Sequence, residues 1–356
     1  MKISSVDLEK LNSGTAWERL SGLGRYISLC EGVQAGKLAN DHIHTFYSFS
    51  KYSPTAAALF AKLCGFASAG IADHDSVSGA REFISAGKLI GIPTLVGCEC
   101  RAIMRKTALS GYRLNSPDQT SLAYVVMHGI PEKNLDIVDE FFAPRRRLRF
   151  ERDAAMCEKL SKLTKPLGFG VDFEADVLPL SHAHEGGSVT ERHIVFALAK
   201  KLLLTVDNDT ELRGLLSRLG IFTDEKLYGE NDAEYRLLSL LKSGFVEKFY
   251  IPAGAECPDV SEFVELCNAV GAVPAYAYLG DVAGNSASDK KAQRYEDGCL
   301  DILMPELKRL GFGVVTYMPC RNTKAQVERI KALCREYDFL AVTGGESPLA
   351  GKKCGL

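Results

Sequence analysis

Residues 65–100 read GFASAGIADHDSVSGAREFISAGKLIGIPTLVGCEC, and this stretch contains the pattern that decides the fold. An apolar run over residues 65–72 leads into the polar triplet DHD at 73–75. A helical pattern follows, and a second apolar run over residues 92–97 ends in the triplet CEC at 98–100. Near-continuous apolar runs separated by a helix are typical of buried parallel strands. The stretch therefore predicts a strand–helix–strand unit in which polar side chains follow each strand.

The same alternation extends over most of the chain. Seven apolar runs predict strands at residues 38–44, 65–72, 92–97, 121–127, 271–279, 313–318 and 339–343. Between them, amphipathic patterns predict helices at residues 54–63, 77–89, 260–270, 303–310 and 323–337. Seven β/α units of one kind predict an α/β protein, built either as a doubly wound sheet or as a closed barrel.

One region interrupts the alternation. From about residue 145 to residue 250 the strand signal disappears, and helical patterns cover residues 154–163, 190–204 and 232–241. We therefore expect an N-terminal helical extension over 1–37, a barrel formed by 38–144 and 251–356, and a helical insertion over 145–250 that contributes to the site. The charged run RRRLR at 145–149 is interpreted as a solvated helix face rather than a polyanion site.

The composition is that of an ordinary globular protein. The 356 residues include 43 Lys and Arg against 45 Asp and Glu, a net charge of −2, which argues against a nucleic-acid polymer or an anionic membrane as the main partner. The 11 cysteines include no C-x-x-C pair, so we expect reduced thiols and a cytoplasmic location. No signal peptide and no apolar run of membrane-spanning length is evident, so neither secretion nor membrane insertion is expected.

The seven histidines all lie between positions 42 and 193. Four of them and one glutamate follow or end the first four predicted strands, namely His42, His44, His74, Glu99 and His128. His42 and His44 are two residues apart, so on a strand both side chains point to the same face and can chelate one ion. A carboxylate such as Glu99 can bridge two ions, and imidazole with carboxylate suits zinc, iron or manganese. The alternative is that each histidine makes a separate hydrogen bond in the core, but their convergence at strand ends favours a metal centre.

These residues resemble a known family. The strings DHIHTFYSFS at 41–50, GIADHDSVSG at 70–79 and VGCE at 96–99, followed by a lone histidine, resemble the polymerase-and-histidinol-phosphatase (PHP) superfamily of metal-dependent phosphoesterases. The segment GGSVTERHIVFALAKKL at 186–202 is similar to the family's Arg-x-His helix start. The resemblance implies a distorted, TIM-like barrel of seven β/α units.

The resemblance also implies roles for individual residues. His42 and His44 would bind one metal, Glu99 would bridge, and His128 with His193 would hold a second metal. His74 matches the ligand of a third ion. Asp73 is then expected either to fix the tautomer of an imidazole or to bind a metal directly.

The sequence departs from the family pattern at three places. Ser48-Phe49-Ser50 stands where the family carries SDG, and Ala277-Tyr278-Leu279 stands where it often carries AHP. The closing Ser-Asp-x-His is replaced by TGGESP at 343–348, in which Glu346 would be the substitute carboxylate. We therefore expect two well-formed sites for Zn, Mn or Fe and a third site that is weak or empty.

A pair of metal ions that activates a water needs cationic side chains to hold the substrate's phosphate. Arg192 is the first candidate, and Arg101 and Arg321 are further ones. His182 and His184 precede the Arg-x-His segment on a loop, where either is a candidate general acid or substrate contact, His184 for catalysis and His182 for binding. Cys98 and Cys100 alternate with Glu99, so we expect them to face away from the site as buried fillers.

Together these features predict a metal-dependent phosphoesterase acting on a small phosphorylated metabolite or nucleotide. Two alternatives remain open. The first is a degenerate metal-binding module without catalysis, which the missing ligands favour. The second is an amidohydrolase-like hydrolase of C–N or C–O bonds, which the same metal ligands would also serve.

Overall fold

Seven strands form one sheet that almost closes into a barrel. The computed structural model describes residues 5–116, 118–282, 295–319 and 321–345. The strands lie side by side in chain order, and their bounds are β1 Asn40–Ile43, β2 Ala69–His74, β3 Thr94–Ile103, β4 Leu122–His128, β5 Val273–Tyr278, β6 Val314–Tyr317 and β7 Leu340–Thr343. Next to the two edge strands, Thr343 Oγ1 donates to the Ala39 carbonyl oxygen at 3.0 Å, and the Gly345 amide donates to Asn40 Oδ1 at 2.9 Å. These contacts draw the edges together and confirm the predicted seven-stranded barrel.

One strand runs against the others. β4 pairs antiparallel with β3 and with β5, whereas all other neighbouring strands are parallel. The expectation of uniformly parallel strands is therefore wrong at β4. The physical reason lies in the β3–β4 connection, whose described residues form no helix, whereas a parallel return normally needs a helical crossover. As a result the last residue of β4, His128, lies opposite Gly97 in the middle of β3.

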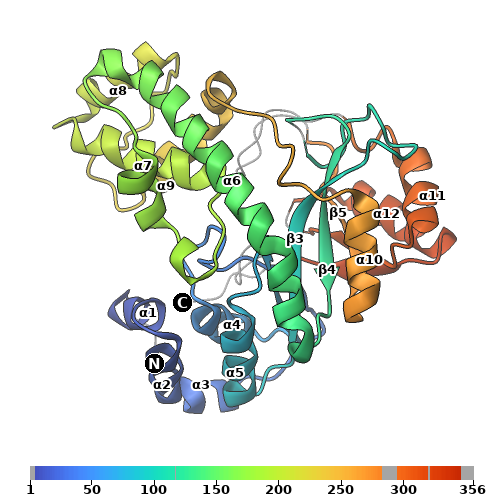
Figure 1. Ribbon diagram of the computed structural model, residues 1–356. Helices are drawn as coiled ribbons and strands as arrows, with labels where there is room; N and C mark the ends of the chain where they lie inside the picture. Colours follow the sequence, from blue (N-terminus) through green and yellow to red (C-terminus); the bar gives the residue numbers. More distant parts are fainter. Residues whose placement is uncertain (1–4, 117, 283–294, 320, 346–356) are drawn as a thin grey trace.

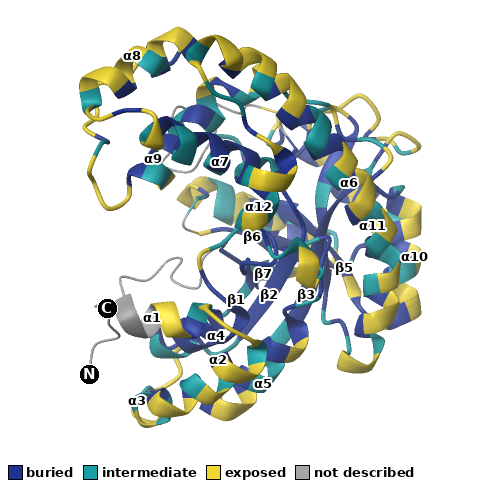
Figure 2. Ribbon diagram, turned by 60° about the vertical axis from the view of Figure 1, so that its left-hand side comes forward, coloured by how far each residue is buried: buried dark blue, intermediate teal, exposed yellow. Residues whose placement is uncertain are grey.

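Helices cover the outside of the barrel (Figures 1 and 2). Their bounds are α4 Pro54–Leu63, α5 Ala80–Ile90, α10 Val260–Val270, α11 Leu300–Leu310 and α12 Lys324–Glu336. α4 begins as its sequence predicts, because the Ser53 hydroxyl accepts the Ala56 amide at 3.0 Å and Pro54 takes the first helical position. Large buried side chains such as Phe142, Phe263 and Phe312 fill the layer between helices and strands.

The inside of the barrel is packed with small side chains. A separate cluster there consists of Ala72, Val126, Ala275, Ala277 and Val314. Strand alternation puts these residues on the face opposite to the large outer core. Because they fill little volume, they leave space in the barrel for the imidazole rings described below.

The N-terminal helices α1 Ser5–Asn12, α2 Ala16–Leu23 and α3 Ile27–Glu31 pack against α4 and α5. A buried ion pair fastens this layer, because Arg19 Nε lies 2.9 Å from Glu82 Oε1 and Arg19 Nη2 lies 2.7 Å from Glu82 Oε2. Thr55 on α4 also donates to Glu82 Oε1 at 2.7 Å. One carboxylate on α5 thus connects α2 with α4.

Between β4 and β5 the chain is mostly helical, with α6 Leu135–Thr164, α7 Glu191–Leu204, α8 Asp209–Leu219 and α9 Ala233–Gly244. α6 is continuous over 30 residues and runs from the barrel into this region (Figure 1). Its first half belongs to the barrel's outer core through Val138 and Phe142. Its second half, with Met156 and Leu160, belongs to a separate hydrophobic cluster shared with α7, α8 and α9. α6 is therefore the link between the barrel and the helical insertion.

Most of the described cysteines behave as small core residues. Eight are free thiols and all eight are buried, including Cys98 and Cys100, which lie in the outer core as expected. Across the residues described here, no helix is both long and apolar enough to cross a bilayer.

Candidate metal centre

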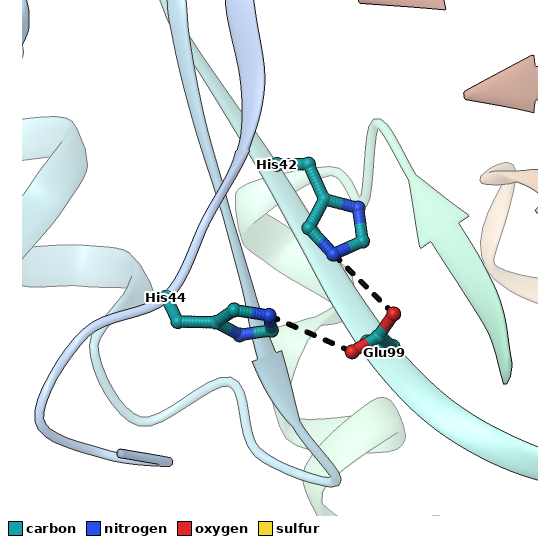
Figure 3. A group of neighbouring side chains, drawn as sticks. All are labelled: His42, His44 and Glu99. Atoms are coloured by element: carbon teal, nitrogen blue, oxygen red, sulfur yellow. Dashed lines mark ion pairs between the residues drawn. The ribbon is translucent and has the colours of Figure 1, made fainter. Parts of the chain in front are cut away.

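One buried carboxylate, that of Glu99 on β3, lies at the centre of the site (Figure 3). His42 Nε2 lies 3.3 Å from Glu99 Oε1, and His44 Nε2 lies 3.6 Å from Glu99 Oε2. In the part of the chain that the structure describes, His42, His44 and Glu99 are the only group of three or more possible ligands whose atoms all lie within 4.8 Å of one another. His74 Nδ1 approaches Glu99 Oε2 to 2.9 Å from the other side.

The barrel's strand register explains this convergence. His42 and His44 follow one another on the same face of β1 and its continuation, as the two-residue spacing predicts. His74 ends β2 and is the register partner of Glu99 on the neighbouring strand. The rings of His44 and His74 stack with their centroids 4.7 Å apart. The residues predicted from three separate strands therefore form a single cluster.

The electrostatics of Glu99 favour a bound cation. Burial alone would raise the pKa of this carboxyl, but the imidazoles of His42 and His74 outweigh burial and hold the pKa well below its usual range. The group is therefore a carboxylate, and only 5% of the residue is exposed. A buried anion surrounded by imidazole nitrogens is a donor set that fits a divalent zinc, iron or manganese ion.

His128 is buried at the end of β4. Its Nε2 lies 3.2 Å from Thr316 Oγ1 on β6, while its Nδ1 is buried without a hydrogen-bond partner among the described residues. Burial lowers the pKa of His128 to about 3, so the ring is neutral. The Nδ1 atom lies over Gly97, where an added Cβ would come within 2.7 Å of the Met127 carbonyl oxygen. Glycine at 97 thus permits the close approach of β3 to β4, and the unpartnered nitrogen of His128 fits a metal ligand.

His193 lies at the start of α7, outside the group formed by His42, His44 and Glu99. Its Nδ1 accepts the Thr190 amide at 3.0 Å, which caps the first turn of α7. Burial lowers the pKa of His193 to about 3, so the ring is neutral. Its ring lies edge-on to Phe49 with centroids 4.9 Å apart. The ligand role that the resemblance implies for His193 stays a prediction.

Asp73 acts on the site through other residues. Its carboxylate accepts the Thr45 amide at 2.6 Å, the Thr45 hydroxyl at 2.6 Å and the Ser48 hydroxyl at 2.7 Å. Ser48 Oγ in turn lies 3.4 Å from His44 Nδ1. The expected direct contact between Asp73 and an imidazole is thus replaced by a chain through Ser48. This chain holds the turn after β1 and orients His44.

A pocket opens beside the metal cluster, between the barrel and the helical insertion. The barrel lines it with His44, His74, Glu99 and Tyr124, and the insertion lines it with three cationic side chains and one acidic side chain, Arg149, Arg192, Lys242 and Glu191. Burial raises the pKa of Glu191, but the charges of Arg101, Arg152 and Lys242 outweigh it and lower the pKa. Phe49, Leu279 and Met318 add apolar surface.

The arginine run at the start of the insertion is not a solvated face. Arg146 and Arg149 are buried, and Arg149 lines the pocket while pairing with Asp75 on the barrel. Only Arg147 of the arginines in the run is exposed. The interpretation of the run as a solvated face is therefore wrong, because α6 lies along the barrel and turns one side of the helix inward.

The predicted substrate contacts divide into two groups. Arg192 lines the pocket, as expected for the first candidate. Arg101 points into the barrel, but its Nη2 lies 3.4 Å from Glu256 Oε1, and Arg321 Nε donates to the Leu279 carbonyl oxygen at 3.1 Å. Neither of these two guanidinium groups is part of the pocket lining. Both therefore hold the walls of the site together.

The loop histidines also lie outside the pocket lining. His182 stacks on Phe46 with centroids 3.7 Å apart, and the side chain of His184 is 73% exposed beside Glu185. Tyr278 faces the outer core and donates to Asp297, so it does not replace the family's histidine at the site. Glu346 lies outside the described residues.

Arg149, Lys242 and Tyr124 also line the pocket, although no pattern in the sequence was interpreted as placing them there. For Arg149 a signal existed, because Arg146 and Arg149 are three residues apart and therefore share one helix face. The position of Lys242 on α9 left no such signal, since only the packing of the insertion brings it to the barrel.

Comparisons with known proteins bear on this arrangement. Two solved structures share the fold. A proposed metal-dependent phosphoesterase from Bifidobacterium adolescentis is 23% identical, with a TM-score of 0.60 over 91% of this chain and 92% of that chain. An amidohydrolase from Chromobacterium violaceum, solved with bound sulfate and no metal, is 14% identical, with a TM-score of 0.56 over 87% of each chain. A search of curated proteins finds no match. The model of the PHP domain matches residues 41–251, which is more than half of the sequence. The chain therefore belongs to the PHP domain family.

Proposed function

We propose that this protein is a metal-dependent phosphoesterase that hydrolyses a small phosphorylated metabolite or nucleotide. Membership of the PHP domain family supports a metal-dependent hydrolase in general. The specific proposal of a phosphoesterase rests on the pocket, which Arg149, Arg192 and Lys242 line together with residues of the metal cluster. Three cationic side chains opposite a metal centre suit a dianionic phosphate, whereas a neutral amide or ester substrate would not need them.

The proposed roles follow from position. His42, His44 and Glu99 would hold one divalent ion, and His128 with the shared Glu99 would contribute to a second. Bound divalent ions lower the pKa of a water and neutralise charge on a phosphoryl group. Arg192 and Lys242 bind the phosphate oxygens and orient the ester bond toward the cluster. Phe49 and Leu279 exclude water from the pocket rim.

The test is a hydrolysis assay on purified full-length protein loaded with Mn²⁺. A panel of small phosphorylated sugars, amino-acid phosphates and nucleotides is compared with carboxylic esters and cyclic amides. We expect turnover of one or more phosphates and its loss in His42→Ala, with Lys133→Ala, an exposed change outside the site, as the control.

Each alternative has its own outcome in this assay. Turnover of an amide or ester but of no phosphate would replace the proposal with the amidohydrolase-like function. Stoichiometric metal binding without turnover of any substrate would instead favour the non-catalytic module.

A further inference from the structure

Asp75 connects the metal centre to the helical insertion. It directly follows His74, and its amide donates to the Glu99 carbonyl oxygen at 2.8 Å. Its carbonyl oxygen accepts Arg146 Nη1 at 2.8 Å, and its carboxylate pairs with Arg149 Nη2. Both arginines come from one face of α6. A single barrel residue therefore receives two guanidinium groups from the same helix.

The backbone of Asp75 supports a specific role. Its φ is +51°, in the left-handed region that non-glycine residues rarely adopt. Such a conformation costs of order 1 kcal/mol and persists where surrounding contacts hold it. Here the contacts with Glu99 and Arg146 fix the backbone, so the carboxylate points at Arg149 rather than into solvent.

Arg149 retains hydrogen-bonding capacity toward the pocket. The residue is 4% exposed and lines the pocket together with His44, His74 and Glu99. Asp75 engages one end of the guanidinium, at Nη2. The Nε–H group is buried and has no acceptor within the described part of the chain. A buried donor without an acceptor is costly unless a ligand supplies one.

We propose that Arg149 binds the phosphate of the substrate together with Arg192 and Lys242, and that Asp75 is the positioning residue that holds Arg149 beside the metal cluster. This inference rests on the phosphoesterase function proposed above. The Nε–H group of Arg149 donates to a phosphate oxygen while Nη2 stays on Asp75. Asp75 keeps the long arginine side chain in one conformation, which reduces the entropy lost on binding.

The experiment measures binding of inorganic phosphate to the Mn²⁺-loaded full chain by titration calorimetry, with metal content determined on the same samples. Arg149→Met is expected to weaken phosphate binding roughly 10- to 100-fold at unchanged metal content, as for the loss of a charge-assisted hydrogen bond. Asp75→Asn is expected to weaken it about 10-fold. The double variant is expected to bind no more weakly than Arg149→Met alone, because Asp75 acts through Arg149.

Arg147→Met is the matched control, since Arg147 lies in the same run but is exposed. It should bind phosphate as the wild type does. If Arg149→Met does not fold, Arg149→Lys replaces it, and a several-fold loss is expected because an ammonium lacks the planar fork.

Three results would overturn the inference: unchanged phosphate binding in the Arg149 variants, additive losses in the double variant, or a loss that appears only together with loss of metal. Failure of the underlying function looks different. If the protein is not a phosphoesterase, the metal-loaded wild type binds no phosphate at all. If only the role of Arg149 is wrong, the wild type binds phosphate and the Arg149 variants bind it equally well.

Discussion

At the scale of single residues, the site depends on which atom of each side chain is already engaged. His128 and His193 are both buried and neutral, and each has one ring nitrogen in contact with a threonine: His128 Nε2 with the Thr316 hydroxyl and His193 Nδ1 with the Thr190 amide. The other nitrogen of His128, Nδ1, is buried without a partner among the described residues. These contacts depend on the folded structure, and no spacing rule reveals them.

Phe49 leads to a prediction about the third metal. It occupies the position where the family pattern carries a carboxylate, lines the pocket and lies edge-on to His193. An apolar ring cannot ligate a cation. We expect the wild type to hold two ions per chain and Phe49→Asp to hold a third, measured by elemental analysis after dialysis against Mn²⁺. Phe49→Leu should stay at two. Three ions in the wild type, or no gain in Phe49→Asp, would contradict this account.

At the scale of elements, strands were more predictable than their directions. The runs at 121–127 and 271–279 identify β4 and β5, but an apolar run reads the same whichever way the strand points. Direction depends on the connection, and the β3–β4 connection has no helix in its described residues. The metal cluster was predictable because strand alternation is a local rule. The position of Arg149 in the pocket was not predictable, because the side of α6 that is buried depends on tertiary packing.

The segment after β5 leads to a prediction about pH. Glu296 accepts hydrogen bonds from the Tyr276 hydroxyl at 2.7 Å and the Gly280 amide at 2.7 Å, which ties this segment to the strand. Burial, with a smaller contribution from Asp297, raises the pKa of Glu296 to about 7 against an ordinary value of 4.5. The folded chain therefore holds this proton more tightly than the unfolded chain. The resulting stability is complete below about pH 4.5 and is lost as the pH rises through about 7.

Glu296→Gln cannot ionise and should lose this dependence. Between pH 5 and pH 8 the free energy of unfolding of the wild type is expected to fall by roughly 1–3 kcal/mol relative to the variant. Urea denaturation at four pH values measures the difference. Parallel pH profiles for the two proteins would show that Glu296 titrates normally.

At the scale of the whole molecule, metal binding and folding are linked. His42 and His44 come from β1 and its continuation and Glu99 comes from β3, so an ion bound by all three would connect two strands that are separated by β2. A ligand that binds only the folded state stabilises it by about 2.7 kcal/mol at 100 times its dissociation constant. We expect Mn²⁺ or Zn²⁺ to raise the midpoint of thermal unfolding and a chelator to reverse the increase.

Glu99→Gln should abolish most of the metal-dependent increase, because the carboxamide has no negative charge to offer the ion. Glu140→Gln, an exposed change on α6, serves as the matched control and should keep the full increase. Equal increases in both variants would place the metal elsewhere.

The continuity of α6 has a consequence for how such proteins diverge. The proposed metal ligands lie between residues 42 and 128, whereas the proposed phosphate-binding side chains come from residues 149–242. If these proposals hold, two separate stretches of the gene, joined by α6, determine the chemistry and the choice of substrate. We then expect that exchange of the second stretch gives the same centre a new substrate, provided that α6 keeps its length and therefore the rotation of one end relative to the other.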